Sequence, residues 1–157
     1  MASNRDKRRY AFQALYQFDA HGPTAGEQVS AWLGETAGLT PEERTEIYKL
    51  AVDAFAARDK ADHEFRELAP TWPAHRQPAV DRAILRLAHF ELARPGGMEK
   101  GRLIINDAIE LTKEYSTDRS PSFVNGLLDK VYKRLGGGAT ATTAIDAPAP
   151  GETPAAK

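Results

Sequence analysis

The sequence predicts an all-α fold. Apolar residues recur at spacings of three and four along most of the first 135 residues, which is the period of amphipathic helices. Runs of alternating β-branched residues bounded by hairpin turns are missing. The chain has 157 residues, the length of one domain, and shows no repeat of fixed length. We therefore expect a compact helical bundle.

About six to seven helices in two subdomains are expected, and the apolar pattern locates six of them. In chain order they cover about residues 4–19, a short stretch around 29–33, a long stretch from 41 to 68, then 80–92, 103–115 and 120–135. The long helix has the clearest start, because Thr40 can cap it, Pro41 suits its first position and Glu43 completes a capping box. Its apolar positions skip Arg58 but recur at threes and fours on both sides of it, and we interpret this pattern as one continuous helix. Ser120 before Pro121 repeats the same capping pattern.

Prolines and small residues mark the breaks between these helices. Pro70, Pro73 and Pro78 interrupt the pattern and predict the main internal connection. Residues 136–157 consist mostly of Gly, Ala, Thr and Pro and have almost no large apolar side chain, so they cannot offset their ordering entropy. We expect a folded domain over residues 1–135 and a disordered tail over 136–157.

Composition excludes several classes of protein. With 21 Lys and Arg against 22 Asp and Glu, the net charge of −1 gives no overall attraction to polyanions, so any such binding needs a local patch. Cysteine is absent, which removes thiolate zinc sites and thiol nucleophiles. No apolar run is long enough for a signal peptide or a membrane span. We expect a cytoplasmic protein without a membrane anchor or cofactor.

Motifs for enzyme chemistry are absent from the sequence. There is no glycine-rich nucleotide loop and no nucleophile elbow. Residues 59–64 gather Asp59, Asp62 and His63, and a small hydrolase or a metal site built on them is one hypothesis. The spacing favours a solvated helix surface, with Lys60 and Glu64 paired beside the histidine. We expect no catalytic residues and no metal ligands.

Two segments suit RNA. The first is the basic start Arg5, Lys7, Arg8 and Arg9, followed by Tyr16 on the same helix, since guanidinium groups bind phosphates and aromatic rings stack on bases. The second is the loop before the last helix, which offers hydroxyls, an arginine and a helix N-terminus. Its candidate residues are Ser116, Thr117, Arg119, Ser120, Ser122 and Phe123. A solvated helix end and a capping loop with Phe123 in the core are the structural alternatives.

A third segment suits a protein partner. The helix over residues 80–92 has an apolar face for the core and an opposite face that carries Asp81, Arg82, Arg86 and Glu91. The pattern is typical of a solvated face and would equally serve a polar interface. His89 on this helix is interpreted as a packed or rim histidine.

Four blocks of the sequence resemble the NusB family of bacterial transcription antitermination factors. They are residues 8–16 (RRYAFQALY), 80–92 (VDRAILRLAHFEL), 105–113 (INDAIELTK) and 123–130 (FVNGLLDK). Four ordered blocks are more specific than any one of them. Residues 17–78 match only in helical pattern.

The resemblance implies two small helical bundles at an angle and a role without bond chemistry. It implies that the basic start and the loop over 116–122 bind single-stranded boxA RNA, with Phe123 beside a base. It also implies that the pair formed with NusE, a ribosomal protein of the small subunit, joins RNA polymerase in an antitermination complex on ribosomal RNA operons. Asp81 matches the family's contact to NusE.

Other hypotheses remain open from the sequence. The module is also similar to the RNA-binding part of ribosomal RNA cytosine methyltransferases, but these need a catalytic domain and a nucleophilic cysteine that this chain lacks. A protein-interaction adaptor with incidental RNA binding is the main alternative function. No residue pattern decides whether the chain forms a homodimer.

Overall fold

The structure is a computed structural model that describes residues 2–136. Within that range it consists of α-helices, short 3₁₀ turns and loops, so the predicted all-α class is confirmed. The α-helices are α1 (Asn4–His21), α2 (Gly26–Glu35), α3 (Pro41–Ala56), α4 (Arg58–Leu68), α5 (Ala79–Ala93), α6 (Gly101–Tyr115) and α7 (Ser120–Leu135). Apart from Gly136, the tail expected over 136–157 lies outside the described residues.

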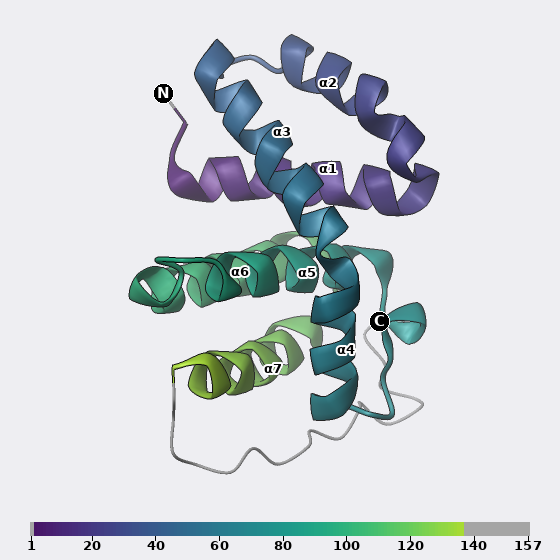
Figure 1. Cartoon of the computed structure of the whole chain (residues 1–157), viewed down its shortest axis with the longest axis vertical. Coiled ribbons are helices and arrows are strands. Elements are labelled where there is room, and N and C mark those ends of the chain that lie inside the picture. The colour runs from purple at the N-terminus through teal and green to yellow at the C-terminus, as the bar shows by residue number, and fades with distance from the viewer. Residues whose placement is uncertain (1, 137–157) are drawn as a thin grey trace.

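The helices form two groups that share one core. Helices α1, α2 and α3 lie together at one end of the molecule, and α4 runs beside α5, α6 and α7 at the other (Figure 1). Helix α5 lies between the groups and packs against α1, α3, α4, α6 and α7. Among the described residues, no helix is both long and apolar enough to span a bilayer.

The long helix expected up to Leu68 is in fact two helices. The chain bends at Ala57, whose φ of −91° and ψ of 7° depart from helical values. The Arg58 guanidinium lies 3.9 Å from the centre of the Phe55 ring and donates a hydrogen bond to the Phe55 carbonyl oxygen at 2.7 Å. This side chain satisfies a carbonyl that a continuing helix would have bonded through its backbone. The skipped position in the apolar pattern therefore marked a bend.

Of the two predicted helix caps, the structure confirms one and contradicts the other. The capping box of α3 is confirmed, because the Thr40 hydroxyl accepts from the Glu43 amide and the Glu43 carboxylate accepts from the Thr40 amide. The cap predicted at Ser120 is wrong. Arg119 holds the N-cap position but its side chain does not cap the helix, and Ser120 is the first residue of α7 with its hydroxyl turned inward to Asp81.

The acidic cluster on α4 is also less exposed than expected. The Glu64 carboxylate lies 2.7 Å from His89 Nε2 on α5 and accepts a hydrogen bond from Arg134 on α7 at 3.2 Å. Asp62 accepts from Arg86 at 2.7 Å. The interpretation as a solvated surface is wrong for these two carboxylates. It is right for His63, whose side chain is exposed, and the packed reading of His89 is confirmed.

Replacing Glu64 should change how stability depends on pH. The His89 hydrogen bond, opposed by burial, lowers the pKa of Glu64. A lowered pKa contributes stability above the ordinary glutamate value of about 4.3, and this contribution is lost as pH falls through the folded-state pKa. We expect Glu64→Gln to lower the free energy of unfolding at pH 7 by about 1 kcal/mol, a value discounted for partial exposure.

Urea denaturation of both proteins between about pH 3 and pH 7 measures this difference. The gap should close in acid. Glu67→Gln is the control, because the Glu67 side chain is mostly exposed and its pairs are surface pairs. A gap that stays constant with pH would show that the Glu64 charge contributes nothing.

Candidate nucleic-acid interface

The basic start of the chain is part of a regular helix. The Ser3 hydroxyl accepts a hydrogen bond from the Asp6 amide at 3.0 Å, and the Asp6 carboxylate accepts one from the Ser3 amide at 3.4 Å. These contacts form a capping box at the start of α1 and lower the pKa of Asp6. The arginines that follow are therefore held at fixed positions around the helix.

Arg8 lies inside the protein. Its Nε donates to Glu91 on α5 at 2.7 Å and its Nη1 donates to Asp107 on α6 at 2.6 Å. Burial lowers the pKa of Arg8, but the two carboxylates outweigh this effect and raise it, so the guanidinium stays charged. The sequence predicted Arg8 as an RNA contact, and the structure instead places it as the ion pair that holds α1 against α5 and α6.

Arg5 and Arg9 face α6 and remain partly exposed. Arg5 Nε lies 3.3 Å from Asp107, with 45% of the Arg5 side chain accessible. Arg9 Nη2 donates to Glu114 at 3.0 Å, near the end of α6. Because exposed pairs of this kind are worth at most about 1 kcal/mol, a phosphate can compete with the carboxylate for either arginine.

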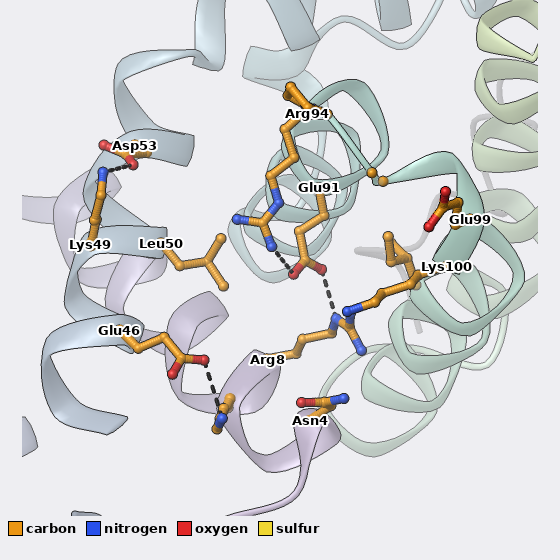
Figure 2. A pocket seen from close by; sticks show the side chains of 15 residues that line it. Asn4, Arg8, Glu46, Lys49, Leu50, Asp53, Glu91, Arg94, Glu99 and Lys100 are labelled. Atoms are coloured by element: carbon orange, nitrogen blue, oxygen red, sulfur yellow. Dashed lines mark hydrogen bonds and ion pairs between the residues drawn. The ribbon is translucent and has the colours of Figure 1, made fainter. Parts of the chain in front are cut away.

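Lys7 points away from these arginines, toward α3. Its ammonium group donates to Glu46 at 3.1 Å and lines a groove of about 600 Å³ between α1, α3 and the turn that joins α5 to α6 (Figure 2). Lys100 and Glu99 lie on the opposite wall of this groove. Cations and carboxylates are nearly balanced along it, so it has no clear preference for an anion. The predicted basic cluster is thus divided among three sides of α1.

Two exposed aromatic rings lie on or beside α1, the helix that carries the arginines. Tyr16 is 43% exposed and Tyr115, the last residue of α6, is 36% exposed. Tyr115 packs edge-on against Phe12 with ring centres 5.1 Å apart, and its hydroxyl accepts from Gln13 at 3.4 Å. The structure therefore joins the two predicted RNA segments along one face of α1. Sequence reasoning missed Tyr115, although an aromatic directly before a loop of hydroxyls was a visible signal.

The loop between α6 and α7 is held by hydrogen bonds to the start of α5. The hydroxyls of Ser116 and Ser120 both bind the Asp81 carboxyl group at the start of α5, and Thr117 Oγ1 lies 3.2 Å from Ser120 Oγ. Ser120 is fully buried, so the structure gives this predicted RNA contact an interior position. Ser122, in the first turn of α7, is exposed, and Arg119 is partly buried.

Phe123 is also a core residue in this structure. Its side chain is 9% exposed and its ring meets the ring of Trp72 edge-on, with centres 4.0 Å apart. The sequence left open whether this ring packs in the core or stacks on a base. The structure favours the core, since a stacked base needs an exposed ring face.

The face of α5 predicted to contact a partner is mostly buried. Asp81 is 0% exposed and Glu91 is 3% exposed, so neither offers a free carboxylate. Arg86 is buried as well, and together with the half-buried Arg82 it pairs with Asp19 of α1. Both arginines line a second groove of about 630 Å³ beside the 3₁₀ turn at Ala74–Arg76. The expectation of a solvated face is therefore wrong, because five helices surround α5.

Within residues 2–136, no group of three or more His, Asp or Glu side chains is placed to hold a metal ion. Asp62, one of the residues of the hydrolase hypothesis, accepts a hydrogen bond from Arg86. The side chain of His63 is exposed and lies beside Glu67 on the same helix. The part of the chain that the structure describes thus offers no arrangement that favours this hypothesis.

The comparisons with known proteins agree with this geometry. The model of the NusB family matches residues 5–133, which span the whole helical body. This chain belongs to the NusB family. It is 42% identical to the transcription antitermination protein NusB of Roseiflexus sp. (strain RS-1) over an alignment of 139 residues, which covers 85% of this chain and 95% of that protein.

Solved structures of NusB proteins share the fold. The NusB of T. maritima superposes with a TM-score of 0.69 at 28% identity, over 84% of this chain and 92% of that one. A NusB chain in a complex of the antitermination factors NusB and NusE with double-stranded RNA gives a TM-score of 0.70 at 26% identity, over 83% and 96%. The sequence-based assignment to the NusB family is confirmed.

The interior position of Arg8 predicts a large loss of stability on its replacement. Arg8→Met would leave Glu91 and Asp107 buried without their shared cation, and we expect a loss of about 3–5 kcal/mol in the free energy of unfolding. Arg5→Met is the matched control, because Asp107 keeps Arg8; its expected cost is about 0–1 kcal/mol. Chemical denaturation measures both, and equal costs for the two variants would contradict the interior role.

Proposed function

We propose that this chain is a transcription antitermination factor that binds boxA-type single-stranded RNA jointly with NusE and, within a complex with RNA polymerase, supports transcription of ribosomal RNA operons. Membership in the NusB family and the NusB–NusE–RNA complex among its structural neighbours support the class of function and the two partners. The observation that carries the proposal is the face of α1 on which cations and aromatic rings lie beside the loop between α6 and α7.

The exposed residues define the RNA surface. Arg5 and Arg9 occupy successive turns along one side of α1, and Tyr16 lies about two turns further along the same side. Tyr115 and Ser122 lie at the two ends of the neighbouring loop. Arginine forks would bind phosphates while the two tyrosine rings stack on bases. Tyr115 takes the stacking role that the sequence assigned to Phe123. This surface involves no bond chemistry.

The internal ion pairs explain why a partner is needed. Arg5 and Arg9 already contact Asp107 and Glu114, so a phosphate must displace a carboxylate before it gains an arginine. Affinity for RNA alone should therefore be modest. NusE would add contacts to the same strand, and the groove lined by Arg82 and Arg86 is the site we favour for it. A contact to NusE through Asp81 would require the loop above this residue to open.

The same ion pairs favour a second candidate function. Each of Arg5, Lys7, Arg8 and Arg9 has a carboxylate partner within the protein, as expected if the basic residues serve the fold. In that case the chain is a protein-interaction adaptor and RNA binding is incidental. Replacing Arg5 and Arg9 and measuring RNA binding distinguishes the two functions.

The double variant Arg5→Ala, Arg9→Ala tests the RNA surface. In the presence of NusE we expect it to weaken boxA RNA about tenfold, since two charge-assisted contacts are lost. On a plot of log affinity against log salt, the slope should become shallower by about 1.4, which is about 0.7 for each phosphate contact to a single strand. Fluorescence anisotropy at several salt concentrations measures both quantities.

The control is Lys60→Ala, which removes an exposed cation from α4, away from α1 and the α6–α7 loop. It should bind RNA like the unaltered chain, and a scrambled RNA should bind weakly to all three proteins. If the double variant keeps both its NusE binding and its RNA affinity, the adaptor function is the better description.

RNA and NusE should strengthen each other's binding. Two ligands that share a surface are linked by one coupling free energy, so the factor by which NusE tightens RNA must equal the factor by which RNA tightens NusE. A coupling of about 1–3 kcal/mol, or about 5- to 150-fold, is typical. Calorimetric titrations in both orders measure the two factors. A factor of one in both titrations would contradict the shared surface, whereas unequal factors would show only that the titrations had not reached equilibrium.

A further inference from the structure

Asp81 differs from the two buried carboxylates that pair with Arg8. The side chain is 0% exposed at the start of α5, yet among the described residues it forms no ion pair. Glu91 and Asp107 are equally buried, and both have Arg8. A buried carboxylate without a cation is costly, so either hydrogen bonds or a proton must compensate.

The groups that meet Asp81 are hydroxyls from the loop between α6 and α7. Ser116 Oγ bonds Oδ1, and Ser120 Oγ lies 2.7 Å from Oδ2. The two serine oxygens are themselves 2.9 Å apart, which is a hydrogen-bond distance. Asp81, Ser116 and Ser120 therefore form a closed ring of three oxygen-to-oxygen contacts.

The number of protons that the ring needs indicates whether Asp81 is ionised or neutral. Three hydrogen bonds need three protons, and the two serines supply one each. The Thr117 hydroxyl does not complete the count, because it brings one proton and also one further contact, with Ser120 at 3.2 Å, so the group of contacts is still one proton short. If Asp81 were ionised, both serine protons would point at the carboxylate and the two serine oxygens would face each other with lone pairs only. A protonated carboxyl group supplies the third proton, and every contact is then a hydrogen bond.

The surroundings of Asp81 also favour the neutral acid. Burial raises the pKa of this carboxyl group and outweighs the opposing effect of the two serines. No charged side chain of the described residues contributes to the shift, since the groups that act on it are Ser116 and Ser120. The pKa and the proton count thus point in the same direction.

We propose that Asp81 is a positioning residue, a neutral carboxylic acid that closes a ring of hydrogen bonds with Ser116 and Ser120 and thereby fixes the loop between α6 and α7. The loop is short, with α6 ending at Tyr115 and α7 starting at Ser120, so the ring holds both of its ends. Residues 117–119 are then presented in one conformation beside Tyr115. The consequence for RNA rests on the proposed function, whereas the ring itself does not.

Infrared spectroscopy tests the proton directly. The difference spectrum between the unaltered chain and Asp81→Asn at pH 7 should contain the carbonyl band of a protonated carboxyl group. If the spectrum shows a carboxylate band in its place, the neutral acid is excluded. This measurement needs neither RNA nor NusE.

Amide hydrogen exchange tests the positioning. An asparagine amide can accept one serine proton and donate one of its own, so Asp81→Asn should keep the ring and the slow exchange of the loop. Asp81→Ala should speed exchange at residues 116–120 about tenfold or more while the amides of α1 keep their rates. Ser116→Ala removes one member of the ring with a smaller change in volume, and serves if Asp81→Ala does not fold. Asp129→Ala removes a half-exposed carboxylate further along α7, outside both the ring and the loop, and is the control.

RNA binding in the presence of NusE completes the test. We expect Asp81→Asn to stay within about twofold of the unaltered chain and Asp81→Ala to bind about tenfold more weakly. Equal damage by the two variants, or unchanged exchange in both Asp81→Ala and Ser116→Ala, would overturn the positioning role. If the unaltered chain does not bind RNA, the proposed function fails, and the infrared and exchange results still decide the ring.

Discussion

The structure depends on the pairing of charges carried by a helix that is buried on nearly all sides. Helix α5 runs through the centre of the molecule, and its Arg86, His89 and Glu91 are almost inaccessible to water. Each must find a partner, because a buried charge or polar group without one is costly. The partners come from different helices: Arg86 meets Asp19 of α1 and Asp62 of α4, His89 meets Glu64 of α4, and Glu91 meets Arg8 of α1.

These pairs determine which helices can surround α5 and at what register. Apolar packing alone tolerates shifts along a helix, whereas a guanidinium that must meet two carboxylates does not. The pairs are more important for alignment than for net stability, since the loss of hydration offsets much of their attraction. The two groups of helices in Figure 1 are therefore joined by an apolar core and aligned by ion pairs that cross it.

Much of the fold could be predicted from the sequence, because the signals concerned are local. The helices, the capping box at Thr40 and the proline-rich connection each depend on residues within a few positions. The environment of α5 could not be predicted in this way. A stripe of charges opposite an apolar stripe looks the same whether it faces water or four oppositely charged neighbours, and those neighbours are distant in sequence. The bend at Ala57 was missed for a different reason: the apolar pattern resumes after the skipped Arg58, and the contact of Arg58 with Phe55 is visible only in the structure.

The candidate site could likewise be predicted only in part from the sequence. The sequence identified two segments that could meet RNA, and the structure joins them through Phe12, Gln13 and Tyr115. It could not separate Arg8 from Arg5 and Arg9, because adjacent residues of one type differ only in the direction they point from the helix. Ser120 and Phe123 point inward for the same geometric reason, as residues of the first turn of α7.

The burial of Arg8 has a further consequence for how α1 would meet a nucleic acid. Many basic termini are flexible, and they lose conformational entropy when a polyanion straightens them. Here the buried Arg8 anchors α1 to the rest of the fold. Arg5 and Arg9 are therefore held on a rigid helix, and they are separated by about 6 Å along its axis. A strand that bound there would displace carboxylates from Arg5 and Arg9 but would not have to order the helix that carries them, so most of the ordering cost would fall on the nucleotides.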